Sequence, residues 1–97
     1  ENSSFGKNTL YSNTSGYDNT GIGMSSFYTN IDGYENTAIG YFADVSSSSL
    51  NNATAIGANA TGNAINKGMI GKGTVTVIEG QVAYSFPSDG RFKTNVT

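Results

Sequence analysis

The side chains that could do chemistry in this 97-residue chain are hydroxyls, carboxylates and tyrosine rings, because the sequence contains no His and no Cys. Without His, a serine–histidine–acid triad is excluded and the commonest metal ligand is missing. Without Cys, disulfides and thiolate metal sites are excluded. The Gly-rich stretches precede extended segments and no helix, so they do not fit phosphate-binding loops. We therefore expect no cofactor, no metal site and no activity on an external substrate.

Two carboxylates and two pairs of tyrosines recur at one constant interval along the chain. Asp18 and Glu35 could hold a cation between them, but a solvated surface is the favoured interpretation. The tyrosine rings could stack on a sugar or pack against a partner, and packing is favoured. The tyrosine pairs are Tyr11 with Tyr28 and Tyr17 with Tyr34.

A 17-residue repeat explains this interval. The segment 2–6 returns at 19–23, 36–40 and 53–57, and each copy ends in an apolar residue followed by Gly. After Gly57 the period shortens to 14, since Ile70 follows Ile56 at that spacing, and the lost residues come from the middle of the unit. Within each copy, residues alternate between two faces as in a strand, and no helical stripe exists. The sequence predicts an all-β solenoid of short parallel strands, with 17- and 14-residue coils.

Columns of equivalent residues should run along this solenoid. We expect the large apolar column to form the narrow core of the coil. The opposite face carries Ser4, Gly21, Ala38 and Ala55, which implies close approach of either the far wall or a neighbouring chain. The terminal Gly of each copy indicates a conformation or spacing that a Cβ would block. The apolar ladder consists of Phe5, Ile22, Ile39, Ile56 and Ile70.

One large apolar residue per strand buries little surface, so a monomeric solenoid is less favoured than a homotrimer. Three copies around an axis would share the small-residue faces and close the core. The net charge is −2, with no basic cluster beyond Arg91 and Lys93, which argues against a nucleic-acid partner. No apolar stretch is long enough to insert into a membrane.

The C-terminal quarter of the chain departs from the repeat. Residues 74–78 and 82–86 alternate like strands on either side of a turn at 79–80, which predicts a hairpin or a pair of exchanged strands. Pro87 ends the second segment, and Ser88-Asp89-Gly90 taken alone is typical of a turn. We divide the chain into a repeat region (1–71), a terminal strand pair (72–88) and the start of a further domain (89–97).

Two segments resemble known families. Residues 36–41 and 52–60 resemble the head repeats of trimeric autotransporter adhesins, which implies a trimer of left-handed parallel β-rolls. Residues 80–96 resemble the junction before the C-terminal intramolecular chaperone of endosialidases and related tail spikes. That family's chaperone trimerises the fibre and then cuts itself off between Ser and Asp. The resemblance implies cleavage of the Ser88–Asp89 bond, with Ser88 as nucleophile, Lys93 as its base and Arg91 as a stabilising residue.

Together these features predict a structural segment of a homotrimeric extracellular fibre, on a phage, an injection machine or a bacterial surface. Such a fibre would present or form a host-attachment surface and mature by autocleavage. The alternative is an adhesin module that binds a glycan or protein receptor itself. An ice-binding solenoid is disfavoured, because each Thr of the columns at Thr20, Thr37 and Thr54 shares its face with an isoleucine expected in the core.

Overall fold

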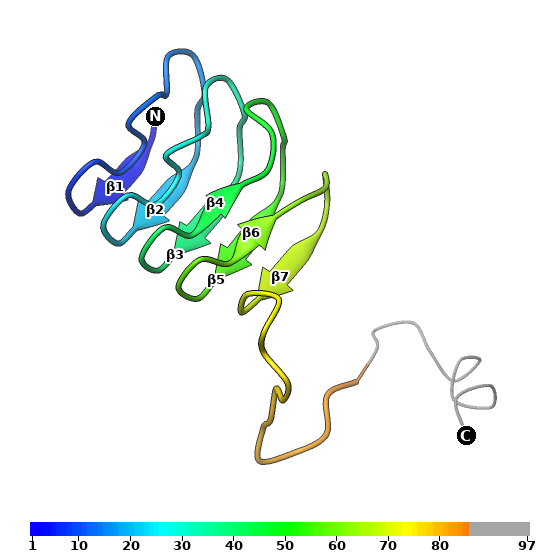
Figure 1. Ribbon diagram of the computed structural model, residues 1–97. Helices are drawn as coiled ribbons and strands as arrows, with labels where there is room; N and C mark the ends of the chain where they lie inside the picture. The colour runs from blue at the N-terminus through cyan, green and yellow to red at the C-terminus, as the bar shows by residue number, and fades with distance from the viewer. Residues whose placement is uncertain (86–97) are drawn as a thin grey trace.

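The computed structural model describes residues 1–85 and contains an all-β solenoid of short parallel strands (Figure 1). The strands are very short, because tight turns interrupt the chain on both sides of each one. They are β1 (Ser3–Phe5), β2 (Thr20–Ile22), β3 (Thr37–Ile39), β4 (Asp44–Val45), β5 (Thr54–Ile56), β6 (Thr61–Gly62) and β7 (Gly68–Ile70).

The strands stack coil on coil in the predicted register. Five of them form one parallel sheet in the order β1-β2-β3-β5-β7, and β4 pairs with β6 in a second, two-stranded sheet. Thr20 pairs with Thr37 and Thr37 with Thr54, and the pairing of β1 with β2 keeps the same 17-residue step. The last pairing joins Thr54 to Gly68 and is a 14-residue step. The two predicted periods are therefore confirmed as the lengths of the coils.

Each coil turns at corners where the backbone enters the left-handed region. At one corner every coil has a glycine, with φ between 85° and 131°. A Cβ on Gly23 would lie 2.7 Å from the carbonyl of Gly40 in the next coil, so conformation and packing both require glycine there, as the sequence predicts. Other left-handed corners hold residues with side chains, at φ between 51° and 61°. They include the columns Asn8–Ser25–Phe42–Asn59 and Asp18–Glu35–Asn52–Asn66.

The interior of the coil is narrow and is filled mainly by small side chains. Ala38 and Ala55, the middle residues of β3 and β5, are buried. In the coil before them Gly21 takes this place, because Phe27 lies across the interior and a Cβ at position 21 would come within 3.1 Å of its ring. The buried apolar cluster consists of Phe27, Ala38, Ala43, Val45, Ala53, Ala55 and Ala60.

Buried asparagines join the coils to one another. The Asn19 side chain accepts a hydrogen bond from the backbone N–H of Asn36 in the next coil and donates to the carbonyl of Gly33. Asn36 repeats both bonds, to the N–H of Ala53 and the carbonyl of Leu50. In a second column, the Asn30 amide donates to the Asn13 carbonyl oxygen at 3.0 Å, so these side chains form an amide ladder along the coils. These bonds satisfy polar groups that would otherwise be costly to bury.

The chain beyond β7 carries no assigned strand in residues 71–85. The predicted hairpin or exchanged pair over 74–86 is therefore not seen in the single chain and stays a prediction. Most of the apolar side chains of this segment, among them Val77 and Val82, are exposed. Within the described part of the chain, no helix is long and apolar enough to cross a membrane.

Candidate interaction surface

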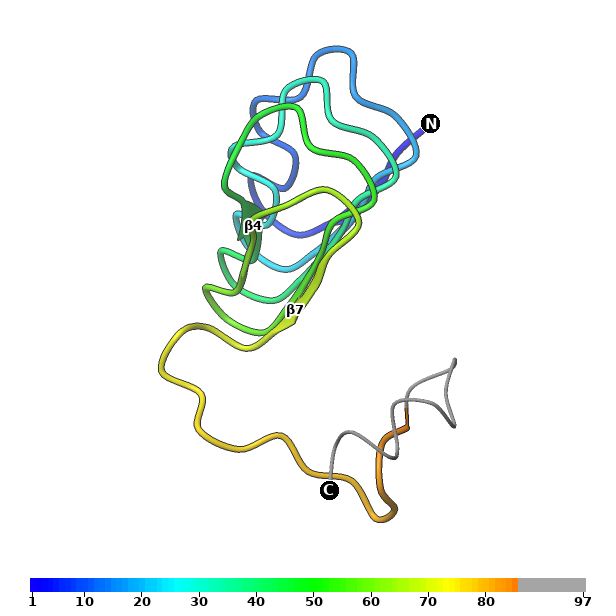
Figure 2. The ribbon, with the colours of Figure 1, turned by 90° about the vertical axis from the view of Figure 1, so that its right-hand side faces the viewer.

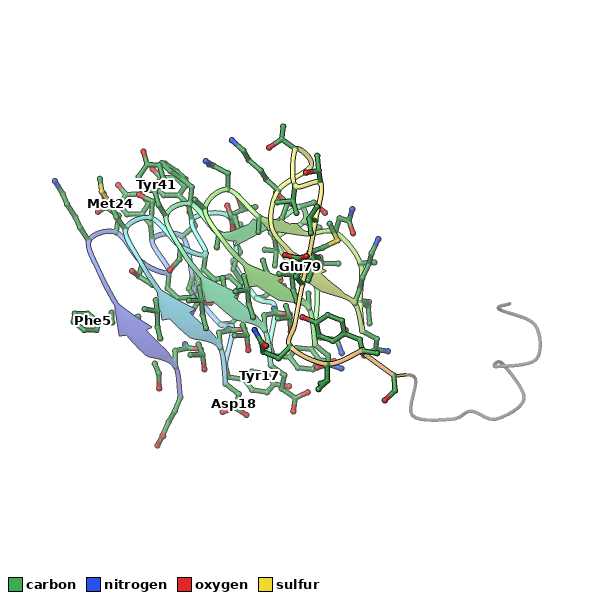
Figure 3. All side chains as sticks on the ribbon, turned by 90° about the horizontal axis from the view of Figure 1, so that it is seen from below. Phe5, Tyr17, Asp18, Met24, Tyr41 and Glu79 are labelled. Carbon is green, nitrogen blue, oxygen red and sulfur yellow. The ribbon has the colours of Figure 1, made fainter. Side chains whose placement is uncertain are left out.

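The large apolar column is the main feature of the outer face of the β1-β2-β3-β5-β7 sheet. Pairing confirms that it is a continuous ladder, since Phe5 lies beside Ile22 and each isoleucine lies beside the next. The predicted position of this ladder in the core of the coil is wrong. Phe5 is 75% exposed, Ile22 44% and Ile70 57%. Figure 3 shows the Phe5 side chain projecting away from its strand.

The reason for this inversion is the width of the coil. In a strand of this kind the middle side chain points opposite to its two neighbours, so Ala38 and Ile39 cannot both face inward. The interior already contains the asparagine side chains and Phe27, so the middle residue of the three inner strands β2, β3 and β5 is Gly or Ala. The terminal strands β1 and β7, at the two ends of the stack, have Ser4 and Met69 there. Thr37 and Ile39 must then face outward. The small-residue column therefore packs against the far wall of its own coil and cannot be the face that three chains share.

Corners with further apolar or charged side chains border the sheet on both sides. Met24 and Tyr41 lie beyond the C-terminal ends of the strands, and Tyr17 and Asp18 lie at the opposite corner (Figure 3). Met24 and Tyr41 belong to consecutive coils and are both about half exposed. The apolar surface thus continues past the edge of the isoleucine ladder on the side of Met24.

The two tyrosine columns form stacks along the solenoid. The rings of Tyr11 and Tyr28 are 4.8 Å apart with an interplanar angle of 11°, and those of Tyr17 and Tyr34 are 4.9 Å apart at 5°. Phe42 then packs against Tyr28 at a tilt of 44°. Each ring covers a face of its neighbour, so a sugar could stack only on the ring at the end of a column. This geometry favours the packing interpretation over a sugar-binding row.

No known family model, curated protein or solved structure matches this chain.

The two residues predicted to carry self-cleavage, Ser88 and Lys93, lie outside the described residues, as does Arg91. Asp18 and Glu35 do occupy equivalent left-handed corners in consecutive coils. Within residues 1–85, no group of three or more acidic side chains is arranged to hold a metal ion.

Sequence reasoning missed a polar feature on the limb of the solenoid farthest from the large sheet. In two of the three 17-residue coils, three consecutive backbone N–H groups converge on one carbonyl of the next coil. The signal was present in the sequence, because position 16 of the chain and its equivalent at 33 are both Gly, whereas position 50 is Leu. That break in the column coincides with the last 17-residue coil.

Proposed function

We propose that the chain is a structural segment of a homotrimeric extracellular fibre, in which three copies pack their β1–β7 sheets around a common axis. The observation that carries this proposal is the outward-facing ladder that ends at Ile70. A continuous exposed apolar stripe on a repetitive rod is typical of an interaction surface. A parallel arrangement of identical rods would place like residues at the same height, so the stripe of one copy meets the stripes of the others.

The composition of the coil interior supports the same proposal. The buried apolar cluster contains five alanines and only two larger side chains, Phe27 and Val45. Fully burying an isoleucine contributes about 1.5–3 kcal/mol, so association through the ladder would add much of the apolar burial that one chain lacks. The exposed apolar residues that follow Ile70 would extend this contact. They are Val75, Val77, Ile78, Val82 and Tyr84.

A matched pair of isoleucines tests the proposal. Ile56 lies in the ladder and is 39% exposed, whereas Ile31 lies on the opposite limb and is 41% exposed. Because association can bury only the exposed two fifths of each Ile56 side chain, Ile56→Asp should remove about 2–4 kcal/mol of burial summed over the three chains of a trimer. It should also place carboxylates at the contact and so produce monomers at micromolar concentration. Ile31→Asp should leave the mass of the assembled particle unchanged. Light scattering of the wild-type chain should give three chains per particle, and a wild-type monomer at high micromolar concentration would refute the proposal.

Maturation by cleavage of the Ser88–Asp89 bond, with Lys93 as the base, belongs to the same proposal and is supported by the sequence resemblance alone. Mass spectrometry of a chain that continues past Thr97 would report whether this bond is cut. Presentation of a host-attachment surface would be the role of the assembled fibre, with a cell-surface glycan or protein as receptor.

The outward orientation of Thr37 and its equivalents favours a second candidate function. With the isoleucines outside the core, the reason for disfavouring an ice-binding face no longer holds, because a regular row of Thr and Ile lies on the outer face of the sheet, at least partly exposed. The two functions need different oligomeric states. A wild-type monomer that shows thermal hysteresis would favour the ice-binding face, and a trimer without it would favour the fibre.

A further inference from the structure

The β1-β2-β3-β5-β7 sheet has two long edges, one at each end of its strands. Met24 follows β2 and Tyr17 precedes it, and the two side chains lie at opposite edges (Figure 3). Both edges are exposed at least in part, and the chain leaves the stack after β7 (Figures 1 and 2). The Met24 edge contains Lys7, Met24, Tyr41 and Lys72. The Tyr17 edge contains Glu1, Tyr17, Asp18, Tyr34, Glu35 and Lys67.

The two edges differ in charge. On the first three coils the Tyr17 edge carries three carboxylates, whereas the Met24 edge carries one lysine and no acid. Asp44, the acid that follows the Met24 edge along the chain, already accepts hydrogen bonds from the backbone N–H and the hydroxyl of Thr29. One positive group opposes this pattern, because the terminal amino group of Glu1 lies 3.9 Å from Oδ1 of Asp18. The last coil, in contrast, has a lysine on each edge.

The second and third coils carry large apolar or aromatic side chains on both edges. Met24 and Tyr17 flank the same strand, β2, and Tyr41 and Tyr34 flank β3, so each pair lies in one coil. The stacked rings of Tyr17 and Tyr34, 4.9 Å apart, form one aromatic surface along the Tyr17 edge. Met24 is 46% exposed and Tyr41 50%. A methionine sulfur packs favourably against an aromatic ring, so the two edges are suited to contact each other.

We propose that the Met24 edge of each copy packs against the Tyr17 edge of the next copy, and that three such contacts close a ring. This inference rests on the proposed function, because parallel copies around a three-fold axis bring opposite edges of neighbouring sheets together. Equivalent coils then lie at the same height. Lys7 lies near the carboxylates of the neighbouring copy, Met24 lies against its Tyr17, and Lys72 lies near its Lys67.

The width of the sheet suits a ring of three. Residues 18–24, which form β2 and its two corners, span about 20 Å at 3.3 Å per residue. In a triangle with sides of that length, each sheet lies about 6 Å from the three-fold axis. This distance leaves room for one large side chain per strand from each copy. The outward ladder from Phe5 to Ile70 supplies one such residue on every strand of the sheet.

Engineered cysteines test this contact, because the chain has no Cys of its own. Met24→Cys and Tyr17→Cys in one chain place two thiols at opposite edges, more than about 15 Å apart and too far for a disulfide within the chain. Mild oxidation should therefore link neighbouring copies, and covalent trimers should be the largest species on a non-reducing denaturing gel. Each single variant should run as a monomer. An equal mixture of the two single variants, assembled together, should give dimers and nothing larger.

The same gel contains the outcomes that would overturn the inference. Met24→Cys combined with Ile31→Cys is the matched control and should give no linked species, because Ile31 is 41% exposed on the opposite limb. Dimers from Met24→Cys alone would indicate a two-fold contact, and species larger than trimers would indicate an open chain of copies. A trimeric wild type whose double-cysteine variant does not link would overturn this inference alone. A monomeric wild type would overturn the proposed function as well.

Two charge variants test the contact without cysteines, and they still decide if the double-cysteine variant does not fold. Lys7→Glu and Lys72→Glu change the net charge of the chain by the same amount, but their effects should have opposite signs. Lys7→Glu brings a carboxylate near the acids of the neighbouring copy and should raise the dissociation constant of the trimer about three- to thirtyfold at low salt. Lys72→Glu brings one near Lys67 and should lower that constant by a similar factor.

The salt dependence and the sign of these two effects complete the test. Both changes should shrink when the salt concentration is raised, because the side chains lie at exposed edges. Analytical ultracentrifugation over a range of protein concentrations would measure the dissociation constants. Changes of the same sign in Lys7→Glu and Lys72→Glu would show that net charge alone matters. That result, or no change in either variant, would overturn the assigned contact between the two edges.

Discussion

Replacement of Gly40 by alanine should destabilise the solenoid by about 2–6 kcal/mol. Gly40 has φ 131°, and a Cβ in this sparsely populated region costs about 1–3 kcal/mol. The added Cβ would also lie 2.7 Å from the carbonyl carbon of Gly57, where ordinary contact begins near 3.4 Å. Relief of this clash requires the two coils to separate locally by about 0.7 Å, the difference between those two distances.

That separation would act on the hydrogen bonds that flank the contact. The N–H of Gly57 donates to the carbonyl of Ile39, and that of Asn59 to Tyr41, both at 2.8 Å. Stretching either bond by about 0.7 Å takes it to the limit of hydrogen bonding, at a cost of about 0.5–1.5 kcal/mol each. The conformational and hydrogen-bond costs together give the stated range.

Urea denaturation followed by far-UV circular dichroism, at one fixed protein concentration, would measure this cost. Gly73→Ala is the matched control, because a Cβ there meets nothing within 4 Å and its φ lies outside the left-handed region. We expect the control to lie within about 0.5 kcal/mol of wild type. A Gly40→Ala variant that also lay within about 1 kcal/mol of wild type would refute the argument that coil spacing requires glycine.

Two further predictions concern single columns of the coil. The Oδ1 atom of Asn30 is buried without a partner, and an asparagine in place of Ser47 could donate to it. Ser47→Asn requires that Leu50 also be replaced by Gly, because a Cβ at the equivalent Gly33 would clash with the Asn30 oxygen. The double variant should therefore be more stable than the sum of the single effects by about 1 kcal/mol, and additive effects in a double-mutant cycle would contradict this coupling. Glu35→Asn should raise the unfolding free energy by about 0.5–1 kcal/mol, because φ at Glu35 is 56° and Asn tolerates the left-handed region best after Gly. Its thermal midpoint, compared with that of wild type, checks this, and a lower midpoint would show that the carboxylate has a structural role.

The repeat made much of the fold predictable. The constant 17-residue spacing places equivalent residues in adjacent strands, so the pairing of Ile22 with Ile39 and of Ile39 with Ile56 follows from counting alone. The requirement for Gly at one corner also followed, because Gly recurs in a column where a Cβ would block the backbone conformation or the coil spacing. The shorter interval between Ile56 and Ile70 located the end of the long coils.

The face that points inward could not be predicted in the same way. Alternation states which residues share a face, and it leaves open which face is inside. The sequence alone favours the larger residues in the interior, because burial of Ile39 is more favourable than burial of Ala38. Large residues face inward in a sheet that is covered by another layer of structure. In this narrow coil, the opposite wall is too close to the sheet for a large side chain to fit between them. The packing of Phe27 over Gly21 indicates this limit, since one ring already requires a residue without a Cβ across from it.

The inward position of the small residues removes one reason for expecting association, namely that three chains would share the small-residue faces. It also leaves the large apolar ladder on the outer face, which favours association more strongly. The strand face that carries Gly21 and Ala38 is already buried within one chain, so it does not require contact with other chains. A ladder beginning at Phe5 and ending at Ile70 lies on the outer face of the sheet, exposed except at Ile39, which is partly buried, and the chain beyond it adds more exposed apolar residues. Asparagine hydrogen bonds hold the coils of one chain together, and the apolar surface remains available to hold chains to one another. The coil interior holds small apolar side chains and asparagines, and the large apolar ladder lies outside, which is the arrangement we expect of a rod that adds to its apolar burial by association.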